Sequence, residues 1–198
     1  MISASHNPCE YNGIKIFKSD GYKLPDALEE EIEAIILDEA RVPPIKVGGE
    51  VGKVTRAQYA LSDYIGHIIS TTNLRFDGMK VALDCANGSA CVTAKELFTT
   101  LGAECHIVSA EPDGVNINDR CGSTHLEQLQ AYTVEQGCDI GLAFDGDADR
   151  LLVIDEKGGL IDGDKIIAIC ALDMKRRGQL AKAVSYTHLR AHETLMNL

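Results

Sequence analysis

The pattern of hydrophobic and polar positions becomes regular after residue 78. From there, short apolar runs alternate with longer segments in which apolar residues recur every three to four positions. The short runs predict β-strands and the longer segments predict helices. We expect strands at 79–84, 104–108, 140–144 and 151–155, and helices at 90–101, 126–136 and 163–177. This alternation favours an α/β fold with a mixed, mostly parallel sheet and helices on both faces.

The chain before residue 79 is less regular. Two short strands are expected at 1–4 and 14–17, around a polar loop. A helix should follow Pro25, because proline suits the first turn, and its apolar face would comprise Leu28, Ile32, Ile35 and Ile36.

A connecting loop and a second helix should follow. Residues 40–55 contain proline and glycine pairs and predict the loop. The helix is expected at 56–72, with Tyr59, Ile65 and Ile69 facing inward. The break at 73–78 predicts a boundary between a first domain, 1–73, and an α/β domain, 74–183.

Charge and composition exclude some classes of protein. The net charge of −11, from 30 acidic and 19 basic residues, disfavours binding to a nucleic acid. No apolar run approaches the ~20 residues that cross a bilayer, and the start lacks a secretory pattern. The seven cysteines form no CxxC pair, which indicates buried thiols in a reducing cytoplasm.

The segment Asp145-Gly146-Asp147-Ala148-Asp149-Arg150 directly follows a predicted strand. Carboxylates at alternate positions can turn toward one hard cation, and oxygen ligands suit Mg²⁺, Mn²⁺ or Ca²⁺ better than zinc. Arg150 adds a guanidinium group, which together with a metal can neutralise a phosphoryl oxygen. The segment therefore predicts a divalent-metal loop that serves phosphoryl chemistry.

Two other interpretations of the aspartate segment were weighed. An EF-hand would use Asp145, Asp147 and Asp149, with Glu156 at its twelfth position. It requires glycine where Arg150 stands, however, and a helix where an apolar strand is expected. A solvated acidic turn would place four charges between two apolar strands without a ligand, which is costly.

A serine loop lies at the other end of the chain. Ser5-His6-Asn7-Pro8 follows the first predicted strand, and a serine at a strand end can carry a phosphoryl group. Taken alone, the segment is more typical of a simple Asn-Pro turn than of a phosphoryl carrier. His6 alone is ambiguous, and Lys15 on the next strand could be an ordinary solvated lysine.

Together these segments resemble the α-D-phosphohexomutase family. Residues 1–8 are similar to its phosphoserine loop, 11–15 to its lysine strand and 144–150 to its metal loop. The segments 114–118 and 121–125 resemble the bacterial phosphoglucosamine mutase branch. The resemblance extends from residue 1 to about residue 183.

The resemblance implies a function for each motif. Ser5 would be a phosphoserine that exchanges its phosphoryl group with a hexosamine phosphate through a bisphosphate intermediate, converting glucosamine 6-phosphate into glucosamine 1-phosphate. Mg²⁺ would be held by the Ser5 phosphate and the three aspartates. Lys15 would act as general acid or base, and His6 and Arg150 would contact the phosphoryl group. The segment 114–125 would either contact the sugar or support the metal loop.

Family members are about twice as long, so the resemblance also implies a fragment. It would contain the end of the first domain and the whole second domain, and alone it should lack mutase activity. Residues 184–198 resemble nothing in the family and are expected to be a non-native tail. A phosphoglucomutase/phosphomannomutase fragment and a non-catalytic metal-binding module stay open as alternatives, and the sequence does not indicate an oligomeric state.

Overall fold

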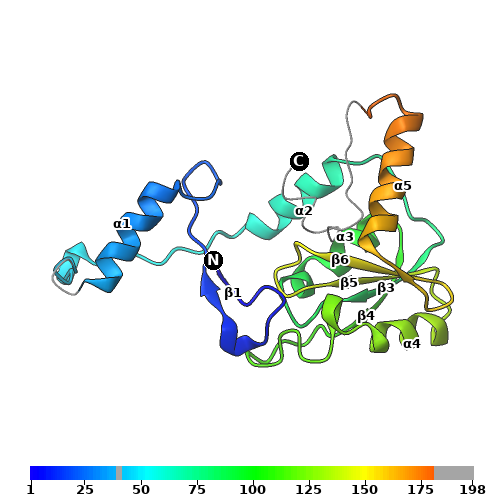
Figure 1. Ribbon diagram of the computed structural model, residues 1–198, viewed down its shortest axis with the longest axis horizontal. Helices are drawn as coiled ribbons and strands as arrows, with labels where there is room; N and C mark the ends of the chain where they lie inside the picture. Colours follow the sequence, from blue (N-terminus) through cyan, green and yellow to red (C-terminus); the bar gives the residue numbers. More distant parts are fainter. Residues whose placement is uncertain (39–41, 181–198) are drawn as a thin grey trace.

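The computed structural model describes residues 1–38 and 42–180. The predicted tail, 184–198, lies outside the described residues. Figure 1 shows an α/β unit at one end, a short N-terminal hairpin against it, and helix α1 set apart from both.

The centre of the α/β unit is a five-stranded sheet. Its strands are β3 (Lys80–Asp84), β4 (Glu104–Val108), β5 (Ile140–Phe144), β6 (Leu151–Asp155) and β7 (Leu160–Ile161), in the order β4-β3-β5-β6-β7. Strand β3 is parallel to β4 and β5, whereas β6 is antiparallel to both of its neighbours. Every strand except β6 therefore runs in one direction, which confirms the mixed, mostly parallel sheet. Strand β7 was not predicted.

Helices cover both faces of this sheet, as predicted (Figure 1). They are α3 (Ala94–Thr100), α4 (Glu127–Glu135) and α5 (Gly163–Arg176). Alternate strand residues point to opposite faces, so two cores form. Val81, Leu83, Leu142 and Val153 pack with Phe98 of α3 and Ile166 of α5, and Ala82, Ala143 and Ile154 pack with Leu129 of α4.

The helix expected at 90–101 is divided in two. A 3₁₀ turn at Ser89–Val92 precedes α3, and Thr93 separates them. The predicted range is right, but the early part follows the tight loop after β3 and so cannot adopt regular α-helix geometry.

The N-terminal segment forms a small separate hairpin. Strand β1 (Ile2–Ser3) pairs antiparallel with β2 (Gly13–Ile14), and a 3₁₀ turn at Cys9–Tyr11 lies between them. Both strands are shorter than predicted. Ile2 and Ile14 are 75% and 76% exposed, because the two-stranded sheet has no layer packed over these side chains within the described residues.

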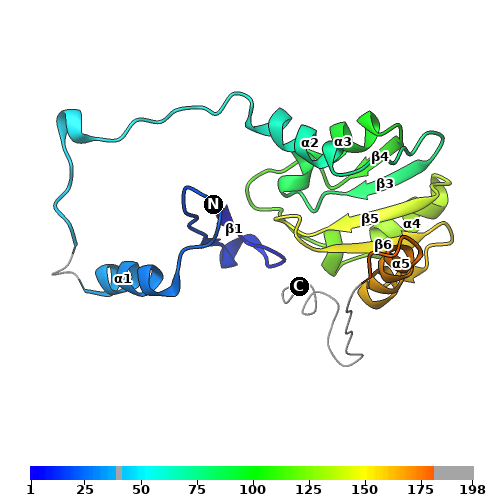
Figure 2. The ribbon, with the colours of Figure 1, turned by 90° about the horizontal axis from the view of Figure 1, so that it is seen from above.

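Helix α1 (Asp26–Leu37) begins after Pro25 as predicted, but none of its residues is buried. On its expected apolar face, Leu28 is 46% and Ile36 is 71% exposed. Figure 2 shows why: the helix lies well away from the sheet. Its apolar face therefore packs against no core in the described part of the chain.

Helix α2 (Ala60–Ser70) is shorter than the predicted 56–72 and packs against α3. Ile65 is buried and Ile69 is half-buried, as expected. The expectation for Tyr59 was wrong: it is 67% exposed, because it precedes the first helical residue. Within the described residues, no helix has the length and apolar character needed to cross a bilayer.

Candidate metal centre

The metal loop and the loop after β3 meet at one place on the sheet. Strand β4 lies on one side of β3, and β5 lies on the other. The chain therefore first adds β4 on one side of β3 and then crosses back to add β5 on the other side, so the strand order reverses between β3 and β5. Ligands of open α/β sheets gather outside the carboxyl ends of the strands at such a reversal. Asp84 ends β3 and Asp145 directly follows β5, so both carboxylates lie at this position.

Three aspartates converge in the loop after β5. Asp145, Asp147 and Asp149 each offer a carboxylate oxygen, and these oxygens lie within 4.8 Å of one another. Asp145 is fully buried, while the side chain of Asp149 is 61% exposed. The Arg150 backbone N–H donates to Asp145 Oδ1 at 3.2 Å, which fixes one end of the loop. The predicted convergence of carboxylates on one point is present.

The arrangement fits a divalent cation. Asp147 Oδ2 accepts from Lys15 Nζ at 2.7 Å and from Ser3 Oγ at 3.1 Å. Asp147 Oδ1 is buried and has no hydrogen-bond partner among the described residues. A buried, unpaired carboxylate oxygen beside two further carboxylates is costly without a cation. Mg²⁺ prefers such oxygen ligands.

Burial and neighbouring charges shift the pKa values of Asp145 and Asp147 in opposite directions. Burial, together with the charges of Asp147 and Asp149, raises the pKa of Asp145. Burial also acts to raise the pKa of Asp147, but the hydrogen bonds from Lys15 and Ser3 outweigh it and the pKa is lowered. The two carboxyl groups are thus in different environments although they share one loop.

The structure excludes both alternatives weighed for the aspartate segment. An EF-hand needs a helix after its loop, but Leu151–Asp155 forms β6, paired along its length with β5. A solvated turn needs exposed carboxylates, whereas Asp145 is completely buried.

Ser5 lies beside this loop although 140 positions separate it from Asp145. Its Oγ is 3.5 Å from Asp145 Oδ2, and its carbonyl oxygen accepts from the Gly146 N–H at 3.0 Å. Its backbone N–H donates to Ser3 Oγ at 2.9 Å. Ser5 has a φ of +50°, which is uncommon for a residue with a side chain. The serine and metal loops therefore form one site.

The predicted cationic residues border the carboxylates. Arg150 Nε lies 4.0 Å from Asp145 Oδ2 and 3.9 Å from Asp149 Oδ1. The hydrogen bond with Asp147 raises the pKa of Lys15, so the amine is held as an ammonium ion. His6 is next to Ser5 in the chain, and its Nδ1 is buried without a hydrogen-bond partner among the described residues.

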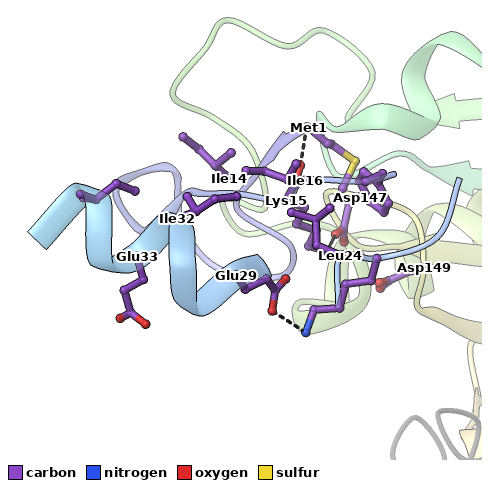
Figure 3. A pocket seen from close by; sticks show the side chains of 13 residues that line it. Met1, Ile14, Lys15, Ile16, Leu24, Glu29, Ile32, Glu33, Asp147 and Asp149 are labelled. Carbon is purple, nitrogen blue, oxygen red and sulfur yellow. Dashed lines mark hydrogen bonds and ion pairs between the residues drawn. The ribbon is translucent and has the colours of Figure 1, made fainter. Parts of the chain in front are cut away.

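A groove of about 870 Å³ opens beside the aspartates, between the segment that follows β2 and helix α1 (Figure 3). Lys15, Asp147 and Asp149 line its end at the metal loop, and Ile14, Ile16 and Ile32 supply apolar walls.

Several residues that build the site were not predicted from the sequence. Asp84 is buried, and its carboxylate accepts from the N–H groups of Ala86 at 2.9 Å and Gly122 at 2.8 Å. Burial raises its pKa despite these hydrogen bonds. An aspartate at the end of a buried strand was a signal available in the sequence, but the partner from residue 122 was not.

Two glycines allow the loops after β3 and β5 to touch. A Cβ on Gly88 would lie 2.3 Å from the carbonyl oxygen of Gly146, and the Ser89 N–H donates to that oxygen at 2.9 Å. In the segment 114–125, Asn118 and Gly122 contact protein groups, and contact of the segment with a sugar stays a prediction.

Comparison with known proteins gives the family. Residues 1–42 match alpha/beta/alpha domain I of phosphoglucomutase/phosphomannomutase, and residues 62–159 match alpha/beta/alpha domain II. The chain belongs to the phosphoglucomutase/phosphomannomutase family. A solved structure of a family protein from Burkholderia thailandensis superimposes with a TM-score of 0.69 at 28% identity, covering 89% of this chain and 37% of that one.

Among curated proteins, the chain is similar to phosphoglucosamine mutases. The phosphoglucosamine mutase of Acetivibrio thermocellus is 53% identical over 180 residues, covering 91% of this chain and 40% of the relative. That of Clostridium acetobutylicum is 53% identical over 184 residues, covering 93% and 41%. The chain thus spans about two fifths of the length of these relatives, as expected of a fragment.

Proposed function

We propose that the chain is part of a phosphoglucosamine mutase, which interconverts glucosamine 6-phosphate and glucosamine 1-phosphate through a phosphoserine at Ser5 and a bisphosphate intermediate. The observation that carries this proposal is the 3.5 Å separation between Ser5 Oγ and Asp145 Oδ2. This short distance places Ser5, the proposed phosphoryl carrier, beside the cluster of carboxylates. The relatives that are about half identical in sequence carry this name.

Asp145, Asp147, Asp149 and the Ser5 phosphate would hold Mg²⁺. When bound, the ion supplies charge neutralisation at the phosphoryl oxygens. Phosphoryl transfer depends mainly on positioning and electrostatic stabilisation, so the surrounding protein needs cations and fixed geometry more than covalent machinery. Asp147 Oδ1, the buried unpaired oxygen, is the atom that most needs such a ligand.

Three basic residues, Arg150, Lys15 and His6, would perform the remaining roles in phosphoryl transfer. Arg150 lies beside both Asp145 and Asp149 and can hold a phosphoryl oxygen with its guanidinium group. Lys15, as an ammonium ion, can donate a proton to the sugar oxygen that loses the phosphoryl group. As a general base it would first have to lose that proton, which its pairing with Asp147 opposes. His6 would contact the phosphoryl group through its free ring nitrogen.

The extent of the chain sets the scope of the proposal. We propose that residues 1–73 belong to the phosphoserine domain and 74–183 to the metal-binding domain. Turnover would require the remaining part of the substrate cleft, because the relatives are more than twice as long. A cytoplasmic location fits the seven cysteines, all of which lie in the described part of the chain as free thiols.

Phosphorylation of Ser5 tests the proposal directly. A full-length protein that contains this chain, and so has the complete substrate cleft, is incubated with Mg²⁺ and glucosamine 1,6-bisphosphate and analysed by intact and peptide mass spectrometry. We expect one phosphoryl group on Ser5, its loss in Ser5→Ala and its retention in Ser19→Ala, a control at a serine in an exposed turn. A chain that binds Mg²⁺ but gains no phosphoryl group would instead support the metal-binding module.

A second candidate function is phosphoglucomutase/phosphomannomutase activity, since the superimposable solved structure carries that family name. The two candidate functions are distinguished by an assay of a full-length protein that contains this chain. Its substrates are glucosamine, glucose and mannose phosphates. We expect the highest kcat/KM with glucosamine phosphate. A preference for mannose 1-phosphate would contradict the choice of substrate.

A further inference from the structure

The side chain of Asn118 lies where three loops meet. It belongs to the segment between β4 and α4 and is only 6% exposed. Its Nδ2 donates to the carbonyl oxygen of Ser5 at 2.8 Å and to that of Asn7 at 2.9 Å. Its own backbone N–H donates to Ala86 O at 2.9 Å. Through its side chain and its backbone, this one residue therefore ties the serine loop to the loop that follows β3.

The two contacts require this type of side chain. Asparagine is the smallest side chain that offers two N–H donors from one nitrogen, so it can serve two carbonyls that face the same point. Asn118 also has a φ of +57°, and asparagine tolerates this left-handed conformation better than most residues do. Aspartate has the same shape but no donor, and glycine accepts the backbone conformation but has no side chain.

The serine loop needs an external support. Ser5 has a φ of +50°, a conformation that costs about 1 kcal/mol or more and persists only where the surroundings hold it. The loop has one internal backbone hydrogen bond, from the Asn7 N–H to Ala4 O at 2.9 Å. Asn118 adds two hydrogen bonds across this turn from outside, one at Ser5 itself.

The same contact reaches the metal loop. The Ser5 carbonyl oxygen that accepts from Asn118 also accepts from the Gly146 N–H at 3.0 Å. The amide nitrogen lies so close to Gly146 that a Cβ there would be 3.0 Å from it. Asn118 consequently contacts the serine loop at the point where that loop meets the metal loop.

We propose that Asn118 is a positioning residue for Ser5: its amide holds the Ser5 and Asn7 carbonyls so that the Ser5 hydroxyl faces Asp145. The inference rests on the proposed function for the role of Ser5, and it gives the segment 114–125 a task in the site that needs no contact with the sugar. Asn118 touches no reacting atom and acts only through the serine loop.

Hydrogen exchange on the full 198-residue chain tests the contact. Asn118→Gly and Asn118→Asp both remove the two N–H donors of the amide. Asn118→Gly also removes the side chain, whereas Asn118→Asp keeps its shape. Asn116→Gly is the matched control, because among the described residues the Asn116 side chain bonds only to Asp113 N and Glu111 O. Losing two ordinary hydrogen bonds predicts exchange about tenfold faster or more at the amides of residues 4–7 of the Asn118 variants. Exchange of β3 and β5 and of the control should match the wild type.

Unchanged exchange at the amides of residues 4–7 of both Asn118 variants would overturn the proposal. Faster exchange throughout the sheet would overturn it as well, because Asn118 would then support the fold as a whole. Either result is independent of whether Ser5 becomes phosphorylated, so it can be told apart from a failure of the proposed function.

A double-substitution experiment tests whether Asn118 acts through Ser5. Mg²⁺ affinity is measured by calorimetry for the wild type, Asn118→Gly, Ser5→Ala and the double variant. We expect Asn118→Gly to weaken Mg²⁺ binding about threefold or more when Ser5 is present and to have no effect in Ser5→Ala. An equal factor in both backgrounds would mean that Asn118 acts on the fold and would contradict the inference. If Ser5→Ala alone binds Mg²⁺ normally, the unphosphorylated Ser5 hydroxyl is not a ligand, and the exchange result still decides the role of Asn118.

Discussion

Lys15 Nζ lies 2.7 Å from Asp147 Oδ2, although 132 positions separate the two residues. The Asp147 side chain is 7% exposed and that of Lys15 is 46% exposed. The ion pair therefore has one buried end, in the metal loop, and one end that faces the groove. The ammonium group would compete with a divalent cation bound at the proposed metal site for the charge of the same carboxylate.

Replacing Lys15 by methionine should therefore strengthen Mg²⁺ binding. Removing one positive charge next to a ligand carboxylate predicts an affinity about three to ten times higher at low ionic strength. Calorimetric titration with Mg²⁺ measures the change. Lys18→Met is the control, because Lys18 pairs with Asp20 on the same segment and contacts none of the aspartates of the metal loop. An affinity equal to or below that of the wild type would show that the ion pair does not compete with the metal.

The buried carboxylate should be essential for the metal. Asp145→Asn replaces a charged ligand with a neutral one of the same shape, and we expect at least a tenfold loss of Mg²⁺ affinity. Asp155→Asn provides the comparison, since Asp155 accepts hydrogen bonds from Lys157 and Gly159 in the next turn and lies outside the cluster. It should lose stability yet bind Mg²⁺ as the wild type does. Equal affinities for both variants would disprove the assignment of the metal centre.

Gly88 should not tolerate even a methyl group. An alanine Cβ there would lie 2.3 Å from Gly146 O, so the two loops would have to separate. We expect Gly88→Ala to lower the free energy of unfolding by about 1–3 kcal/mol and to weaken Mg²⁺ binding by displacing the metal loop. Gly49→Ala has no atom within 4 Å of its Cβ and should be neutral in urea denaturation. A Gly88→Ala chain with wild-type stability and affinity would contradict the contact.

Asp84 anchors two loops from beneath the site. Asp84→Ala leaves the buried N–H groups of Ala86 and Gly122 without acceptors, at a cost of about 1–3 kcal/mol each. We expect the free energy of unfolding to fall by about 2 kcal/mol or more in urea titrations. Asp77→Ala removes only an exposed ion pair with Arg75 and should cost less than about 1 kcal/mol. Similar losses for the two variants would show that Asp84 is no special anchor.

The cysteines should differ in their reactivity toward thiol reagents. Burial raises the pKa of Cys85 to about 12 and that of Cys121 to about 11. A raised pKa keeps a thiol protonated as the pH rises, so both should remain in the unreactive form at pH 8. Cys170 is exposed and should react first. Peptide mapping after brief treatment with iodoacetamide measures the order, and rapid labelling of Cys85 in the native chain would be the contrary result.

Periodicity was sufficient to predict the sheet. The strands at 104–108, 140–144 and 151–155 have the predicted bounds. Those at 140–144 and 151–155 include buried residues and are mainly apolar, which is the pattern that marks a strand in the sequence. The two-residue strand β7 was missed, since so short a strand has no period. Tyr59 was placed inward from helical spacing, but spacing cannot locate the first residue of a helix.

The sequence by itself determined the α/β class, the metal-binding composition of Asp145 to Arg150, and the resemblance that links them to Ser5. These are local properties, because strand periodicity and ligand spacing are written in neighbouring residues. Only the tertiary structure decided that Ser5 lies 3.5 Å from Asp145, that Lys15 pairs with Asp147, and that Asn118 joins the loops. Such contacts join residues more than a hundred positions apart, and they depend on how the separate N-terminal hairpin packs against the loops of the five-stranded sheet, which no local pattern specifies.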